Sequence, residues 1–439
     1  MQIASKAIRP ALPVVSPPMQ ITARGECFGP IPAPARGRRK LTVLALGGVG
    51  LAAALTVAAF VTPNRTVAAA PTYLPTDPTQ IVATVPARDP AEVAARRALA
   101  VSPDRVELAV ALARSDLARY RTLSDPRYLG RAQATLGRWW KLAEPPPDVL
   151  LLRATIEQAI HQFPEARADL DQLIKIRPGD AQAQLTRAVV ATITADYGAA
   201  HDSCRALAAL ASPVVVATCE APLDAVAGKA DEAYARLARL VGATPSGDAG
   251  VRGWALTQLA ELAYMRGDSD AAAAHLRSAI ALDPDDVYAR NLLADVLMAT
   301  GHTPDASRLL AGRDQIDSHL VRRAIAEHDL HGADADRLVA AMRDRIAAAA
   351  ERGDRVHLRE EARFALAVEL DAARAVQLAR DNWSVQKELA DARLLAEAAV
   401  AAGDRDAVAP VSAWARTTGV RDATLDRLLA RLDRNQVTR

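Results

Sequence analysis

The chain has 439 residues, of which half are hydrophobic and 4% aromatic, and its formal net charge is +2. This length suits two or three ordinary domains or one long repeat array. The charge is nearly balanced and the arginines are scattered, so the basic footprint of a nucleic-acid-binding protein is excluded and no nucleic-acid partner is expected. A core of mainly alanine, leucine and valine favours helices over strands.

The chain opens with residues 1–40, which are rich in proline, glycine and alanine and predict a disordered segment. Its last residues form the one dense basic cluster, Arg36 to Lys40. The uncharged run Leu41–Val61 follows. As a helix it would be roughly 31 Å long, enough to cross a hydrocarbon core of about 30 Å. We therefore expect a transmembrane helix at 41–62, with residues 1–40 in the cytoplasm and the rest beyond the membrane.

A cleaved signal peptide is the alternative interpretation of this span. An Ala-x-Ala pattern ends at Ala70, but Pro71 would follow the cut and the apolar run exceeds the usual length. The uncleaved anchor is therefore favoured over secretion. Both readings place the bulk of the chain outside the cytoplasm, in a bacterial periplasm if the anchor stays. The proline-rich residues 63–89 then read as an extended linker.

Helical periodicity begins near residue 90. Residues 90–146 predict a lone helix and then a pair, 103–121 and 127–141, joined by a long turn. We interpret this region as a degenerate N-terminal helical repeat or cap.

The clearest helical hairpin runs from Gly253 to Pro284. Each of its two helices carries one apolar stripe at i, i+3, i+4 spacing. Gly267 and Asp268 break the chain between them, and Pro284 ends the second helix. Neither helix can bury its stripe alone, so the unit needs stacked neighbours.

The same features recur along the chain at near-constant spacing. An alanine begins the second helix of each pair at Ala166, Ala200, Ala233, Ala272 and Ala306. The chain thereby resembles the tetratricopeptide-repeat family, with repeats at 147–180, 181–213, 214–247, 253–286 and 287–320. The packing and turn residues that carry the resemblance are Ala166, Pro178, Ala200, Ala233, Ala260, Gly267, Ala272, Ala279, Pro284, Gly301 and Ala306.

The resemblance implies an all-α fold, a right-handed α-solenoid of seven to eight helical hairpins in which each pair contacts only its neighbours. The array of about five repeats covers 147–320. Residues 321–439 look like degenerate repeats, with weak pairs at 354–383 and 385–416. A last helix, at about 421–433, could cap the stack.

No catalytic constellation stands out. The sequence has no phosphate loop, no Gly-x-Ser-x-Gly elbow and no His-Glu-x-x-His motif, so we expect no enzyme, cofactor or metal. His328 and His331 lie three apart but lack a third ligand, and a solvated helix end is the better interpretation. Cys204 and Cys219 flank a predicted turn at similar distances. Outside the cytoplasm they could form a disulfide, the alternative being two small buried apolar residues.

In this family the first helices line a concave groove that holds peptides or partner helices. The resemblance therefore implies that the faces opposite the packing stripes bind a partner, with Trp254 and Tyr288 alternatively covering a seam between repeats. The second repeat offers a more uniform face that includes Leu185, Val189, Thr192 and Ile193. The candidate groove residues are Trp254, Thr257, Glu261, Tyr264 and Met265 of the fourth repeat and Tyr288, Asn291, Asp295 and Met298 of the fifth.

The predicted function is a membrane-anchored scaffold that binds a protein or peptide partner on the extracytoplasmic side. An accessory subunit of an envelope enzyme or transport complex is one alternative, and it would need acid or base groups such as Glu261 and Asp295. A structural array that assembles into homo-oligomers is the other.

Overall fold

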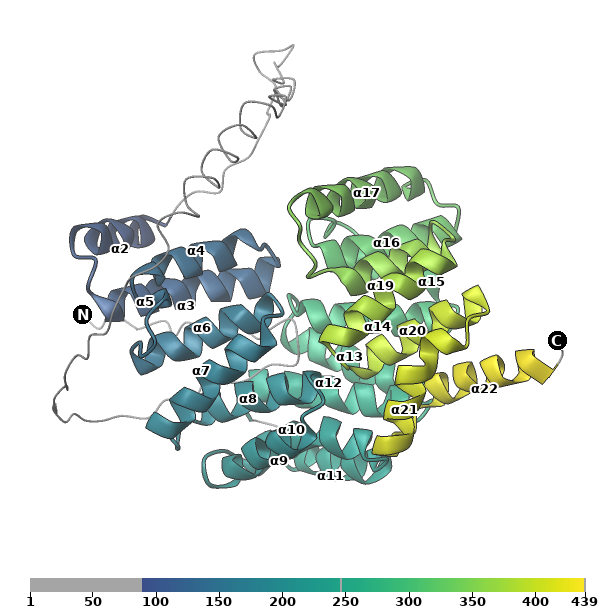
Figure 1. Cartoon of the computed structure of the whole chain (residues 1–439), viewed down its shortest axis with the longest axis horizontal. Helices are drawn as coiled ribbons and strands as arrows, with labels where there is room; N and C mark the ends of the chain where they lie inside the picture. The colour runs from purple at the N-terminus through teal and green to yellow at the C-terminus, as the bar shows by residue number, and fades with distance from the viewer. Residues whose placement is uncertain (1–88, 245–246, 438–439) are drawn as a thin grey trace, which may run out of the picture. The chain divides into compact units, whose positions relative to one another are not determined.

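The computed structural model describes residues 89–244 and 247–437, with side chains to residue 434. Throughout this part the secondary structure is helical, without strands (Figure 1). The helices before the predicted array are α2 (Pro90–Val101), α3 (Val106–Leu123), α4 (Arg127–Thr135) and α5 (Gly137–Trp140). Ala91 to Arg439 fall in one compact unit.

The five predicted repeats each contain one helical hairpin. Their helices are α6 (Pro147–Ala159) and α7 (Phe163–Ile176), α8 (Ala181–Ile193) and α9 (Tyr197–Ala206), α10 (Pro213–Val226) and α11 (Ala230–Ala243), α12 (Ala249–Met265) and α13 (Ser269–Leu282), and α14 (Val287–Ala299) and α15 (Thr303–Leu310). A short 3-10 turn, η1 (Leu207–Ala209), follows α9. Helix α10 continues through Pro222, where the sequence led us to expect a kink.

One turn geometry repeats at all five hairpins. The turn residue has a positive φ, from 60° at His161 to 82° at Gly267, and Ala195 adopts it at 62° without being glycine. The next residue donates its backbone N–H to a carbonyl five positions back, as Asp268 does to Ala263 at 2.9 Å. This is the Schellman arrangement that ends a helix. It holds the register because each turn reverses the chain in the same way.

The predicted small residues lie where paired helices cross. Ala166, Ala200, Ala260, Ala272 and Ala306 are fully buried, and Ala233 and Ala279 are 1% exposed. A larger side chain at these positions would force the helices apart in a core packed at crystal-like density.

The C-terminal part contains more hairpin structure than the sequence revealed. Its helices are α16 (Asp317–Asp329), α17 (Ala335–Glu351), α18 (Leu358–Ala367), α19 (Ala372–Val385), α20 (Leu389–Ala402), η2 (Asp406–Val408), α21 (Ala409–Thr418) and α22 (Ala423–Val437). The α16–α17 hairpin occupies a region in which the sequence analysis placed no pair. Helix α20 then packs mainly on α22.

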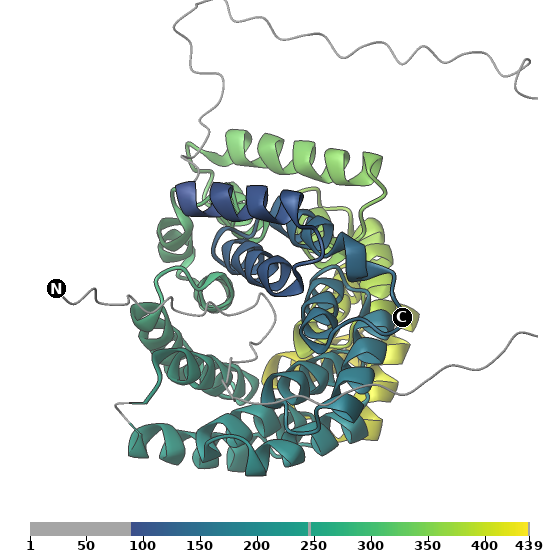
Figure 2. The same ribbon diagram turned by 90° about the vertical axis from the view of Figure 1, so that its left-hand side faces the viewer.

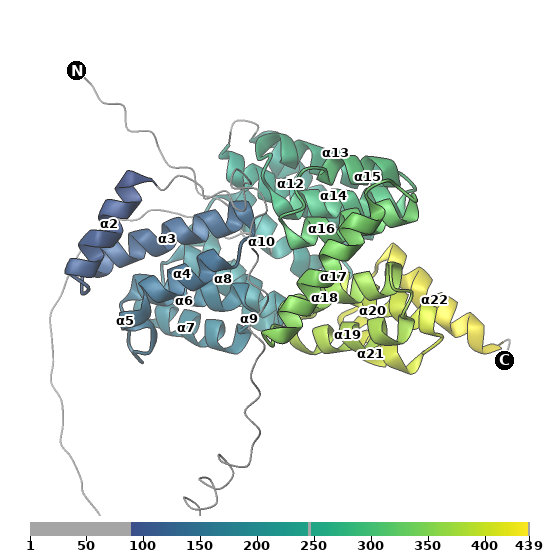
Figure 3. The same ribbon diagram turned by 90° about the horizontal axis from the view of Figure 1, so that it is seen from above.

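The expectation that each pair contacts only its neighbours is wrong for the C-terminal helices. Trp414 of α21 donates its indole N–H to the hydroxyl of Tyr197 in the second repeat, at 2.8 Å. A Cβ on Gly228 would lie 2.6 Å from the carbonyl oxygen of Gly419, so the two turns touch. Figures 2 and 3 show the yellow C-terminal helices beside the teal helices of the array. The superhelix thus folds back on itself, because apolar and polar side chains on both parts find partners there.

The predicted membrane span Leu41–Val61, the linker and Cys27 lie outside the described residues. Among the helices that are described, none is long and apolar enough to span a bilayer.

Candidate binding groove

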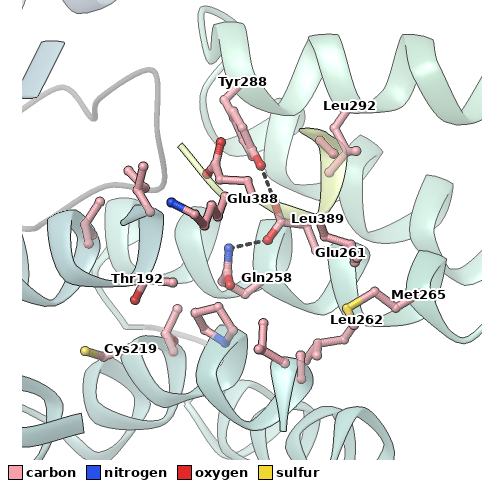
Figure 4. Close-up of a pocket in the computed structure, with 18 of the residues that line it drawn as sticks. Thr192, Cys219, Gln258, Glu261, Leu262, Met265, Tyr288, Leu292, Glu388 and Leu389 are labelled. Carbon is pink, nitrogen blue, oxygen red and sulfur yellow. Dashed lines mark hydrogen bonds between the residues drawn. The ribbon is translucent and has the colours of Figure 1, made fainter. Parts of the chain in front are cut away.

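A mostly apolar cavity lies on the inner face of the first helices of repeats two to five. Its volume is about 160 Å³. Its wall comes from α8, α10, α12 and α14, and Figure 4 shows Thr192, Cys219, Gln258 and Leu262 around it. The apolar lining follows from the sequence: α10 and α12 carry small and branched side chains on nearly every face.

The C-terminal part covers one side of this cavity. Between α19 and α20 the backbone is extended, with ψ of 146° at Gln386 and 158° at Glu388. In this segment Lys387 donates its backbone N–H to the carbonyl oxygen of Ile193, at 2.8 Å. Leu389 packs on the apolar core of the array. The chain therefore places a short extended stretch of its own in the groove.

Charged side chains hold this cover in place. Arg359 of α18 forms ion pairs with Glu388 and Asp391, and Asp391 is almost fully buried. Arg393 pairs with Asp422 and stacks over the ring of Tyr264, with its guanidinium carbon 4.7 Å from the ring centroid. Because several of these carboxylates and guanidiniums are largely removed from water, losing one partner would leave a costly unpaired charge.

Glu261 is the carboxyl group at the centre of the groove wall. Gln258 donates its amide N–H to Glu261 Oε2 at 2.7 Å, and the hydroxyl of Tyr288 donates to Oε1. Figure 4 shows both bonds. Burial raises the pKa of Glu261 to about 7; nearby Glu388 adds to this, while the two hydrogen bonds and Arg393 oppose it. The carboxyl is thus close to half protonated at neutral pH.

Trp254 lies in the same wall and leaves a donor unused. Its side chain is 4% exposed and its indole N–H has no hydrogen-bond partner. A buried donor without a partner costs free energy, so this N–H is a group that a ligand could satisfy.

The structure divides the nine predicted groove residues into two sets. Five line the cavity: Trp254, Glu261, Tyr264, Met265 and Tyr288. The other four do not: Thr257, Asn291, Asp295 and Met298. None of the nine is fully exposed, although the sequence analysis took them to face solvent. The reason is that the C-terminal helices pack against the same face.

The residues outside the cavity have partners within the protein. Asn291 donates its amide to the hydroxyl of Ser318 at 2.9 Å. Asp295 accepts two hydrogen bonds from Arg322, each 2.9 Å, and one from Arg363 at 3.2 Å. Burial alone would raise the pKa of Asp295, but the two arginines outweigh it and lower that pKa. These positions tie α14 to α16 and α18.

Several cavity residues were missed as partners of the fourth repeat. Leu185, Val189, Thr192 and Ile193 of α8 form its far wall, and the sequence analysis had set this face aside as too uniform. The segment 387–390 was missed altogether. The one local signal for it is a helix-to-helix connection, Gln386 to Glu388, that lacks glycine and so does not make the usual tight turn.

The two cysteines of the array are bonded in the structure. Cys204 of α9 and Cys219 of α10 have sulfur atoms 1.99 Å apart. Cys219 also borders the cavity. The bond joins the second repeat to the third beside the groove.

Other sequence features have structural explanations. Arg266 of the Arg-Gly-Asp triplet pairs with Asp231 and lies over the ring of Tyr234. His331 is the positive-φ residue of the α16–α17 turn, with φ of 49°. Within residues 89–244 and 247–437, no group of three or more metal-ligating side chains comes together.

Comparison with known proteins identifies the repeat type. Residues 263–326 match the family model described as tetratricopeptide repeat. This stretch spans the end of α12 through most of α16, so these hairpins are tetratricopeptide repeats within an all-helical array. Comparison of the sequence with curated proteins found no match.

Two solved structures illustrate the similarity of fold. One is PilW, described as a widely conserved type IV pilus biogenesis factor: 18% identity, 46% of this chain, 94% of that chain and a TM-score of 0.37. The other is a tetratricopeptide repeat protein from Parabacteroides merdae, with 14% identity, 66% of this chain, 98% of that chain and a TM-score of 0.34. Likenesses at this level say nothing about the function of this chain.

Proposed function

We infer that the chain is a membrane-anchored scaffold that holds a protein or peptide partner in the groove of its helical array, on the extracytoplasmic side. The observation that carries this proposal is the open apolar cavity in the groove, where Trp254 retains a buried, unpaired N–H. Apolar pockets with a few polar groups are typical binding sites.

The proposed location depends on two further features. The apolar run Leu41–Val61 with its basic flank is the proposed anchor. The bonded pair Cys204 and Cys219 supports an oxidising compartment, because disulfides persist outside the cytoplasm and are rare within it. A reporter fused at the C-terminus tests this. We expect activity from alkaline phosphatase, and activity from a cytoplasmic reporter alone would contradict the proposed orientation.

The groove itself can be tested by photo-crosslinking in intact cells. A crosslinking amino acid at Val189, in the cavity wall, is compared with one at Arg277, which is exposed on α13. We expect an adduct with a distinct protein from position 189 and none from position 277. An adduct only with a second copy of the chain would favour the self-assembling array. Equal adducts at both positions, or none at position 189, would rule out the groove.

A further inference from the structure

The unused polar groups of the cavity are hydrogen-bond donors. The indole N–H of Trp254 has no partner although the side chain is buried. The other charged groups that line the cavity on the C-terminal side are already paired or bonded: Arg359 with Glu388, and Arg393 with Asp422. Lys387, which also lines the cavity, makes no ion pair with any described residue.

The acceptors of the cavity, by contrast, are occupied. Both oxygens of Glu261 accept hydrogen bonds, from Gln258 and from Tyr288. The hydroxyls of Thr192 and Thr218 donate to carbonyls of their own helices, at 2.8 and 2.6 Å. A ligand therefore meets apolar walls with a buried N–H and a free ammonium group, and little that would receive a proton from it.

The size of the cavity limits the apolar part of the ligand. At about 160 Å³ it is close to the ~150 Å³ cavity in another protein that takes up benzene. One aromatic ring or a short acyl chain would fill it. A longer body would have to extend through the open side.

We propose that this cavity binds a small organic carboxylate with an apolar body of about the size of a benzene ring, whose carboxylate accepts hydrogen bonds from Trp254 and Lys387. The apolar body lies among Leu185, Val189, Val226 and Leu262. The site is distinct from a peptide-binding role and does not depend on it. The partial protonation of Glu261 at neutral pH, which follows from its raised pKa, keeps repulsion of the anion low.

The test uses the full chain in zwitterionic lipid nanodiscs, with empty nanodiscs as the blank. Equilibrium dialysis compares three probes with the same ring and chain: 3-phenylpropanoate, 3-phenylpropanamide and 3-phenylpropylammonium. We expect the carboxylate to bind tightest and the ammonium weakest. Equal binding of the three, tighter binding of the ammonium, or no binding of the carboxylate would overturn the proposal.

Variants assign the contacts. Trp254→Phe keeps the ring and removes the N–H, so we expect the carboxylate to bind about tenfold more weakly, as for loss of a hydrogen bond to a charged group. Lys387→Met should abolish the preference for carboxylate over amide. The matched controls are Trp140→Phe and Lys175→Met, which lie outside the cavity. Unchanged binding by Trp254→Phe with native circular dichroism would refute the assigned contact. A failed crosslink at Val189 with intact carboxylate binding would sink only the scaffold role.

Discussion

Trp414 and Tyr197 are joined by a 2.8 Å hydrogen bond across 217 residues of sequence. The bond lies at the end of the region where the C-terminal helices return to the array. The ring of Trp414 also meets Trp383 edge to face, with centroids 5.4 Å apart. Tyr197 begins α9, so the contact connects the second repeat directly with α21.

This contact predicts a measurable coupling between the two ends of the array. Trp414→Phe and Tyr197→Phe should each lower the free energy of unfolding by about 1 kcal/mol, and the double variant should lose little more than one of them. Urea denaturation of the four proteins gives the coupling directly. Strictly additive losses would mean that the hydrogen bond contributes nothing.

The disulfide predicts a redox-dependent stability. Cys204 and Cys219 are 15 residues apart, and closing a loop of that length stabilises a folded protein by about 3 kcal/mol. Reduction with dithiothreitol should therefore lower the midpoint of thermal unfolding of the natural chain. The Cys204→Ala, Cys219→Ala double variant should unfold at the lower temperature with or without reductant. A reductant effect that persists in that variant would contradict this prediction.

Asp295 predicts the cost of breaking the ion-pair network behind the groove. Asp295→Asn leaves Arg322, which is 6% exposed, without its charged partner. We expect a loss of about 3 kcal/mol in the free energy of unfolding. Asp305→Asn is the matched control, because its ion pair with Arg308 is exposed and should be worth less than about 1 kcal/mol. Similar losses in both variants would show that burial does not matter here.

The repeats could be predicted because their signals are local. A glycine at the turn, an alanine at the crossing and a proline after the second helix lie within one hairpin, as Gly267, Ala272 and Pro284 do. The α16–α17 hairpin was missed because its left-handed turn residue is His331, and a histidine does not mark a turn as glycine does. The resulting 6→1 bond, from Gly332 N–H to Glu327 at 2.9 Å, is the same as elsewhere.

The site could be predicted only in part, for a different reason. Trp254, Glu261 and Tyr288 were placed on one face by helical spacing, and they do lie on one cavity wall. Whether that face meets water depends on Lys387 and Arg393, more than 95 residues further along the chain. No periodicity within a repeat encodes such a contact, because it arises from the path of the whole superhelix.

Glu261 predicts a pH dependence of stability with a defined sign. In the folded protein its pKa is about 7, against the ordinary value of 4.5. Between these values the folded state binds more protons than the unfolded state, so stability falls as the pH rises, and the full penalty is present above about pH 7. In a dry site this shift would correspond to about 3 kcal/mol. Because the carboxyl borders an open cavity, we expect roughly 2 kcal/mol.

Glu261→Gln should remove this slope. The difference in unfolding free energy between the variant and the natural chain should shift in favour of the variant by that amount between pH 4.5 and pH 8, whatever constant offset the amide causes. Glu157, whose pKa burial also raises to about 7, is present in both proteins and cancels. Urea denaturation at four pH values measures the shift. A constant difference across the range would mean that Glu261 ionises as an ordinary surface carboxyl, and the hydrogen bonds from Tyr288 and Gln258 would then be needed to hold a full negative charge in the groove.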